Sequence, residues 1–164
     1  MRHNTQLLRA AVTASLMLVA IAGAVVAGPI EDGEAARGRK DYATALRLFR
    51  SLAEQGDATA QEHLGMMYKN GLGVPEDYAE AVLWFRRAAD QGLKTAQWLL
   101  GTMYETGYGV QQDYVQAHMW YNLSASQAWG AAAEARRMLE RAMTPAQVAE
   151  AQKLAREWKP KPER

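Results

Sequence analysis

Few side chains in this sequence could perform chemistry, and their spacing gives weak support for a catalytic or metal site. After residue 27 the chain has two histidines, His63 and His118, and neither has a second histidine at the spacing of helical metal ligands. It has no cysteine, which excludes thiol catalysis, disulfides and cysteine-ligated zinc or iron–sulfur centres. The sequence therefore predicts no metal and no cofactor.

Glycine motifs and serines give no better support for catalysis. The motifs that begin at Gly71 and Gly107 resemble fragments of a phosphate-binding loop, but no strand is predicted before them and the further glycine or lysine is missing. No base pattern lies near Ser51, Ser124 or Ser126. We therefore predict that the protein is not an enzyme and that the glycine motifs are turns between helices.

The first 27 residues have the pattern of a secretory signal peptide. Arg2 and Arg9 precede an uncharged apolar stretch over 10–27, which ends in small residues suited to cleavage between Ala27 and Gly28. The alternative is an uncleaved membrane anchor, because about 18 residues is near the lower limit for spanning a bilayer. The sequence predicts an exported protein, periplasmic or secreted, that contacts a membrane only through this segment if it stays uncleaved.

Length and charge indicate one globular unit without a nucleic-acid partner. The 164 residues are 49% hydrophobic and 23% charged, which is typical of a globular domain. The formal net charge is +1, and removal of residues 1–27 would leave about −1. A net charge this close to zero provides no long-range electrostatic attraction for nucleic acid.

Internal repetition is the strongest feature of the remaining sequence. When residues 41–76 are aligned with 77–112, about 19 of 36 positions are identical, and a third copy begins at Asp113. Asp77 with Glu80, and Asp113 with Gln116, predict capping boxes at helix starts, and Gly92 predicts a helix stop. Each unit is therefore predicted to be a pair of helices that must stack on its neighbours.

Small residues recur inside the second helix of each unit. Ala60 and Gly65 in one copy correspond to Ala96 and Gly101 in the next. Because glycine inside a helix costs about 1 kcal/mol relative to alanine, we expect a close approach of the two paired helices as its compensation.

These spacings carry a family resemblance. The pattern is A-x-x-x-L-G-x-x-Y-x-x-G-x-G-V, followed by D-Y-x-x-A and A-x-Q-G. Its residues in the first copy are Ala60, Leu64, Gly65, Tyr68, Gly71, Gly73, Val74, Asp77, Tyr78, Ala81, Ala89, Gln91 and Gly92. The pattern resembles the Sel1-like repeat, a relative of the tetratricopeptide repeat, and the resemblance implies an adaptor or assembly scaffold. It weakens after residue 127, where Arg136 and Arg137 replace the expected Leu-Gly.

The predicted fold is all-α, a right-handed solenoid of stacked antiparallel helix pairs with a C-terminal capping helix. We divide the chain into a signal peptide (1–27), an N-terminal capping segment (28–40), Sel1-like repeats (41–128), C-terminal capping helices (129–158) and a basic tail (159–164) that we expect to be a frayed end. Thr144 and Gln147 predict a capping box for the last helix, whose apolar face holds Ala151, Ala155 and Trp158.

A partner-binding surface is predicted where the two copies differ. His63 corresponds to Leu99 and His118 to Val82, so both histidines are predicted to be packing or surface positions. Since a helical repeat array forms a concave face, we expect a protein or peptide to bind there. The groove residues are Glu62, Met66, Lys69, Asn70, Trp98, Thr102, Glu105 and Thr106.

Two questions stay open for this surface. Trp98 could anchor a partner or could pack against its neighbour helix. The alternative function is a peptidoglycan- or carbohydrate-associated envelope module, in which Trp98, Tyr68, Tyr104 and Tyr108 stack on sugars. That alternative requires the four rings to be exposed.

Overall fold

The computed structural model describes residues 28–161, and this part is entirely helical apart from its turns. The predicted signal peptide lies outside the described residues. The helices are α2 (Pro29–Gly38), α3 (Tyr42–Glu54), α4 (Ala58–Lys69), α5 (Tyr78–Asp90), α6 (Lys94–Thr106), α7 (Tyr114–Ser126), α8 (Gly130–Leu139), the short 3₁₀ helix η1 (Glu140–Ala142) and α9 (Pro145–Glu157).

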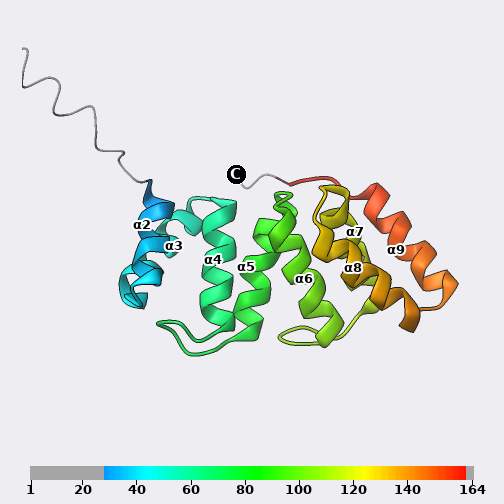
Figure 1. Ribbon diagram of the computed structural model, residues 1–164, viewed down its shortest axis with the longest axis horizontal. Coiled ribbons are helices and arrows are strands. Elements are labelled where there is room, and N and C mark those ends of the chain that lie inside the picture. Colours follow the sequence, from blue (N-terminus) through cyan, green and yellow to red (C-terminus); the bar gives the residue numbers. More distant parts are fainter. Residues whose placement is uncertain (1–27, 162–164) are drawn as a thin grey trace, which may run out of the picture.

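The helices stack in chain order, which confirms the predicted solenoid (Figure 1). Each helix from α2 to α7 packs on the next one, so α3–α4 and α5–α6 are the two units seen in the sequence. Within the described residues, no helix has the length and apolar composition needed to span a bilayer.

Helix starts and stops largely follow the predicted signals. The side chains of Asp77 and Asp113 accept backbone hydrogen bonds from the first turns of α5 and α7, but only this aspartate half of the two predicted capping boxes forms. The box at Thr144 forms completely. Gly92 and Gly107 have φ values of +95° and +78°, the left-handed conformation that ends a helix. The turns predicted at the motifs that begin at Gly71 and Gly107 both lie between helices.

The close helix approach at the glycines joins α4 to α5 and α6 to α7, and not the pairs α3–α4 and α5–α6 that the sequence analysis expected. A Cβ atom added to Gly65 of α4 would lie 2.6 Å from the Phe85 ring of α5, and one on Gly101 of α6 would lie 2.7 Å from the Tyr121 ring of α7. Each glycine therefore allows the next first helix along the chain to pack closely against it. The repeat pattern alone does not predict which helix the glycine contacts, because each second helix has a first helix on both sides.

The N-terminal helix makes the same contact. A Cβ atom on Gly33 of α2 would lie 2.5 Å from the Phe49 ring of α3. α2, which the sequence predicts as a capping segment, thus packs against α3 as α4 packs against α5.

A ladder of buried glutamines joins successive units. Gln61 donates to the backbone oxygen of Ala53 (3.1 Å), and Gln91 donates to the Oε1 atom of Gln61 (2.9 Å). One repeat later, Gln97 donates to Ala89 (3.3 Å) and accepts from Gln127 (3.0 Å). Gln61 and Gln97 are fully buried. Buried amides need such partners, so the ladder also fixes the register between units.

The C-terminal end closes the solenoid in a different way. α9 packs on α7, and the Trp158 ring lies edge-on to Trp120 with centroids 6.2 Å apart. The chain then runs back towards α5 (Figure 1), where the amide of Lys161 donates to the backbone oxygen of Asp90 (2.7 Å). The tail as far as Lys161 is therefore held against the repeats, in contrast to the expected frayed end.

The glycine contact gives a direct stability test. In Gly101→Ala the new methyl group would overlap the Tyr121 ring, so we expect the free energy of unfolding to fall by about 1–3 kcal/mol, as in overpacked cores. Gly38→Ala is the matched control, because a Cβ at Gly38 meets nothing within 4 Å. Urea unfolding measures both. An equal effect of the two substitutions would contradict the contact.

Candidate binding surface

Seven of the eight predicted groove residues lie in the two second helices, α4 and α6, and Asn70 is the C-cap of α4; we call all eight the Trp98 surface. Met66 and Trp98 are half-buried and pack against the same core cluster around Phe85 and Leu100. Trp98 also packs against the next cluster, which contains Tyr121. Trp98 therefore packs against the core, as one alternative predicts, and the residue is not completely buried.

Polar side chains beside Trp98 are held in place by their neighbours. Thr95 donates to the carboxylate of Glu62. The Tyr121 hydroxyl donates to Oε2 of Glu105 (2.5 Å), and its oxygen lies 3.2 Å from Oγ1 of Thr102. Burial, followed by the hydrogen bond to Glu105, raises the pKa of Tyr121, so this hydroxyl stays a donor at neutral pH. The polar groups of the Trp98 surface are thus largely preorganised.

The remaining members of the Trp98 surface lie towards the helix ends. Asn70 donates to the backbone oxygen of Met66 (2.8 Å), and Thr106 donates to that of Thr102 (2.8 Å). Both are exposed, whereas Lys69 is half-buried. These residues give the surface a polar border.

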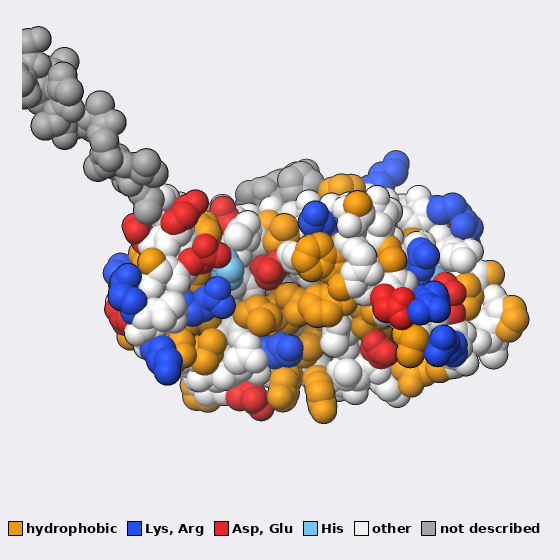
Figure 2. Space-filling view, viewed as in Figure 1, with side chains coloured by type: hydrophobic (Ala, Val, Ile, Leu, Met, Phe, Trp, Pro, Cys, Tyr) orange, Lys and Arg blue, Asp and Glu red, His pale blue; other side chains and the backbone are white. Residues whose placement is uncertain are grey.

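Apolar side chains gather on the face of the solenoid that Figure 2 shows. They form a band along its middle, over the central helices, with single charged side chains beside it.

The two histidines have structural contacts. His63 stacks on Phe49 with ring centroids 4.6 Å apart, and its Nε2 atom lies 3.1 Å from Glu34 of α2. His118 is fully buried, and its Nε2 atom lies 2.9 Å from Glu140. Among residues 28–161, no group of three or more His, Asp or Glu side chains is placed to hold a metal ion.

The aromatic side chains proposed for sugar stacking do not share one exposed surface. Tyr68 and Tyr104 are half-buried against the core, and their hydroxyls accept hydrogen bonds from Arg50 (2.9 Å) and Arg86. Tyr108 is exposed and stacks on Tyr78, with centroids 5.1 Å apart. The carbohydrate alternative therefore loses much of its required surface.

Sequence reasoning missed the arginine–tyrosine pairs. Arg50 and Arg86 occupy the same position in the two units, and each reaches a tyrosine 18 residues later. The identity of both residues in both copies was the available signal. That identity does not predict the pairs, since a sequence comparison does not separate packed from solvent-facing positions.

The Sel1 repeat model matches three consecutive segments of the chain, residues 30–57, 58–93 and 94–128. The chain belongs to the Sel1 repeat family. Sel1 repeat proteins are generally protein-interaction scaffolds. No curated protein matches the chain.

Two solved structures with Sel1 repeats are similar to this chain. One is c5321, a protective antigen of uropathogenic Escherichia coli strains that displays an SLR fold, with 33% identity and a TM-score of 0.68 over 81% of the chain. The other is a Sel1 repeat protein from Oxalobacter formigenes, with 27% identity and a TM-score of 0.66 over 79% of the chain. The match spans 27% of the first protein and 56% of the second.

The partly buried His63 predicts an acid-dependent loss of stability. Burial lowers the pKa of His63 below 6.5, and the smaller opposing effect of Glu34 does not reverse this. The unfolded chain therefore binds the proton more readily, so stability present above about pH 6.5 should decline as the pH falls. His63→Leu, which copies Leu99 of the next unit, should reduce this decline. Urea unfolding at neutral and mildly acidic pH measures it, and an undiminished decline in the variant would contradict the assignment.

Proposed function

We propose that this Sel1 repeat protein is an exported, non-catalytic scaffold that binds a partner protein or peptide through the Trp98 surface. The main supporting observation is the half-buried pair Met66 and Trp98, which packs on one core cluster and is bordered by polar groups already held in place. An apolar centre with a polar rim is the usual composition of a protein interface.

Preorganisation favours binding at this position. The side chains of Glu62 and Glu105 are fixed by Thr95 and Tyr121, so a partner would not have to immobilise them. The aromatic ring of Trp98 is anchored on two core clusters and loses little freedom when it is covered. The proposed partner is a protein segment, since the near-neutral charge of the chain does not favour nucleic acid.

Substitutions at Trp98 and Thr106 test the surface. Trp98→Ala should weaken partner binding by about 2 kcal/mol or more, but it should also lower the melting temperature because part of the ring is core. Thr106→Arg should weaken binding without a change in melting, because Thr106 is exposed at the end of α6. Retention of an envelope protein on the immobilised chain is compared with thermal unfolding for each variant.

Tyr108→Ala provides the matched control, because Tyr108 is an exposed aromatic residue outside the Trp98 surface. Its partner retention should equal that of the unmodified chain. If Thr106→Arg and Trp98→Ala both retain the partner, the Trp98 surface is not the binding site.

Export has a separate test. The apolar stretch over 10–27 and its small-residue end support processing before Gly28. N-terminal sequencing of protein recovered outside the cytoplasm should begin near Gly28. A membrane-embedded chain that begins at Met1 would contradict processing.

A further inference from the structure

The turn after α4 contains the one asparagine of the sequence that is followed by glycine. Asn70 is the C-cap of α4, its side chain is exposed, and Gly71 comes next. The other two asparagines, Asn4 and Asn122, precede threonine and leucine. Asparagine is chemically labile, and a following glycine increases this lability because it has no side chain to shield its backbone nitrogen. The Asn70–Gly71 pair is therefore a candidate for spontaneous modification.

The reaction is an intramolecular condensation followed by hydrolysis. The backbone nitrogen of Gly71 attacks Cγ of Asn70, a Cγ–N bond forms, and Nδ2 leaves as ammonia with the proton of the Gly71 amide. Water then opens the cyclic imide. Cleavage of the new Cγ–N bond gives aspartate, and cleavage of the original peptide C–N bond gives isoaspartate, whose main chain contains an extra methylene group. Either product has a carboxylate in place of the amide.

Two hydrogen bonds keep the reacting atoms apart in the folded chain. Nδ2 of Asn70 donates to the backbone oxygen of Met66 (2.8 Å), and the amide of Gly71 donates to that of Tyr68 (3.4 Å). The ψ angle of Asn70 is 4°, so the backbone must rotate before the Gly71 nitrogen can face Cγ. The bond from Gly71 is longer than an ordinary N–H···O bond, so the attacking nitrogen is held less firmly than the leaving group.

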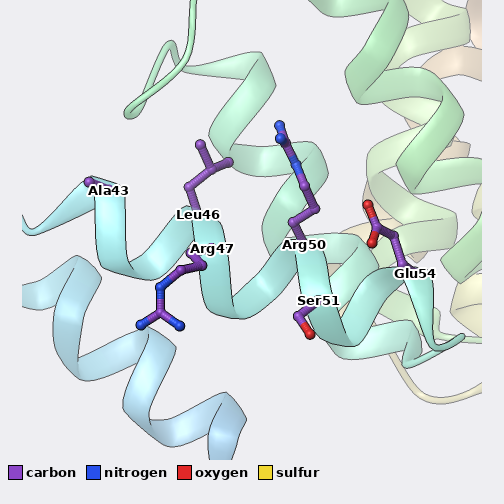
Figure 3. Close-up of a pocket in the computed structure, with 6 residues that line it drawn as sticks. All are labelled: Ala43, Leu46, Arg47, Arg50, Ser51 and Glu54. Atoms are coloured by element: carbon purple, nitrogen blue, oxygen red, sulfur yellow. The ribbon is translucent and has the colours of Figure 1, made fainter.

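The residue before this pair is firmly held. The backbone oxygen of Tyr68 also accepts from the amide of Asp77 (3.0 Å), and its hydroxyl accepts from Arg50 of α3 (2.9 Å). Arg50 extends from α3, where it also lines a hollow on that helix (Figure 3). The rotation that the reaction needs therefore begins after Tyr68.

The turn leaves more room at its first glycine than at its second. A Cβ atom on Gly73 would lie 3.0 Å from Cβ of Tyr42 in α3, which is a tight contact. A Cβ atom on Gly71 would lie 3.5 Å from the amide nitrogen of Glu76, an ordinary contact distance. The backbone of the turn is therefore packed less closely at the reactive position.

The next unit lacks this chemistry at the same position. Thr106 takes the position of Asn70 before Gly107, and its hydroxyl donates to the backbone oxygen of Thr102 (2.8 Å). The threonine therefore makes the same kind of bond to the end of its helix. It has no amide that could leave as ammonia.

The end of α4 also depends more on its capping side chain than the end of α6 does. In α6, Gln112 makes a second bond to the helix end, from Nε2 to the backbone oxygen of Glu105 (2.7 Å). Glu76 takes the position of Gln112 after α4, and an ionised carboxylate cannot donate such a bond. Loss of the Asn70 amide therefore affects the helix end that has fewer side-chain bonds.

We propose that Asn70–Gly71 is a modification site at which the capping amide of α4 is converted spontaneously to a carboxylate, and that the conversion destabilises the last turn of this helix. The carboxylate cannot donate to the backbone oxygen of Met66, so the cap bond is lost. The new negative charge also lies at the C-terminal end of a helix, where the helix dipole disfavours it.

This modification does not depend on the function proposed above. Asn70 belongs to the Trp98 surface, so an effect of the conversion on partner binding would rest on that function. The conversion itself and its effect on stability are properties of the isolated protein, and they can be measured without a partner.

Prolonged incubation of the folded protein, purified after expression of the full chain, tests the conversion. Samples kept at neutral pH and physiological temperature are digested, and mass spectrometry identifies peptides that contain aspartate or isoaspartate in place of asparagine. We expect Asn70 to convert and Asn122, which leucine follows, to stay unchanged. The same incubation in concentrated urea should convert Asn70 faster, because both restraining bonds are then absent.

Two substitutions separate the reaction from its consequence. Asn70→Thr copies the next unit and keeps a donor, so this variant should not convert at this position and should melt like the fresh protein. Asn70→Asp introduces the carboxylate directly. It should lower the melting temperature by about 2–6 °C, the range expected when one hydrogen bond is lost from a domain of this size. The aged protein should change in the same direction.

The modification site is refuted if the folded protein keeps Asn70 intact throughout an incubation that converts it in urea. Equal conversion rates with and without urea would contradict the restraint by the two bonds. If Asn70→Asp melts at the same temperature as Asn70→Thr, the capping amide does not stabilise α4. None of these results bears on the proposed scaffold function, which is tested at Trp98 and Thr106.

Discussion

The architecture depends on the contact between a glycine in one second helix and an aromatic ring in the next first helix. Because Gly65 and Gly101 have no side chain, the rings of Phe85 and Tyr121 lie directly against the helix backbone. A close approach of this kind lets neighbouring units share one core. It also explains why glycine is kept inside a helix, where it is intrinsically unfavourable.

The glutamine ladder uses the same approach and shows why the array ends where it does. Gln61 and Gln97 form hydrogen bonds across three successive helices, which requires those helices to be close. In the third unit, Ala133 stands at the position of Gln97 and Arg137 at the position of Gly101. α8 therefore lacks both the glutamine and the glycine that contact the following first helix in the earlier units. α9 packs on α7 instead, and its Trp158 ring lies edge-on to Trp120.

The local parts of the structure could be predicted from the sequence, because their signals are contained in a few consecutive residues. The aspartate caps, the glycine stops and the Thr144 capping box are of this kind. The direction of the glycine contact and the bond between Lys161 and Asp90 could not be predicted, since each depends on which distant segments meet. At the candidate site, the helical spacing predicted neighbouring positions on the second helices, and seven of the eight residues lie within α4 and α6; the contacts of the Tyr121 hydroxyl with Glu105 and Thr102 could not be predicted.

Comparison of the repeats also separates positions whose residues make the contacts of the solenoid from positions whose residues differ between units. The glutamines and the seating glycines are the same in both complete units, and their partners are internal. By contrast, one position differs among three successive first helices. It is the charged Arg47 in α3, the exposed apolar Leu83 in α5 and the covered apolar Met119 in α7. Because the core contacts do not involve the first two, their chemistry can differ without loss of the fold. The side chain at this position can therefore differ along the array, and on α7 the chain itself supplies the helix that covers it, α9.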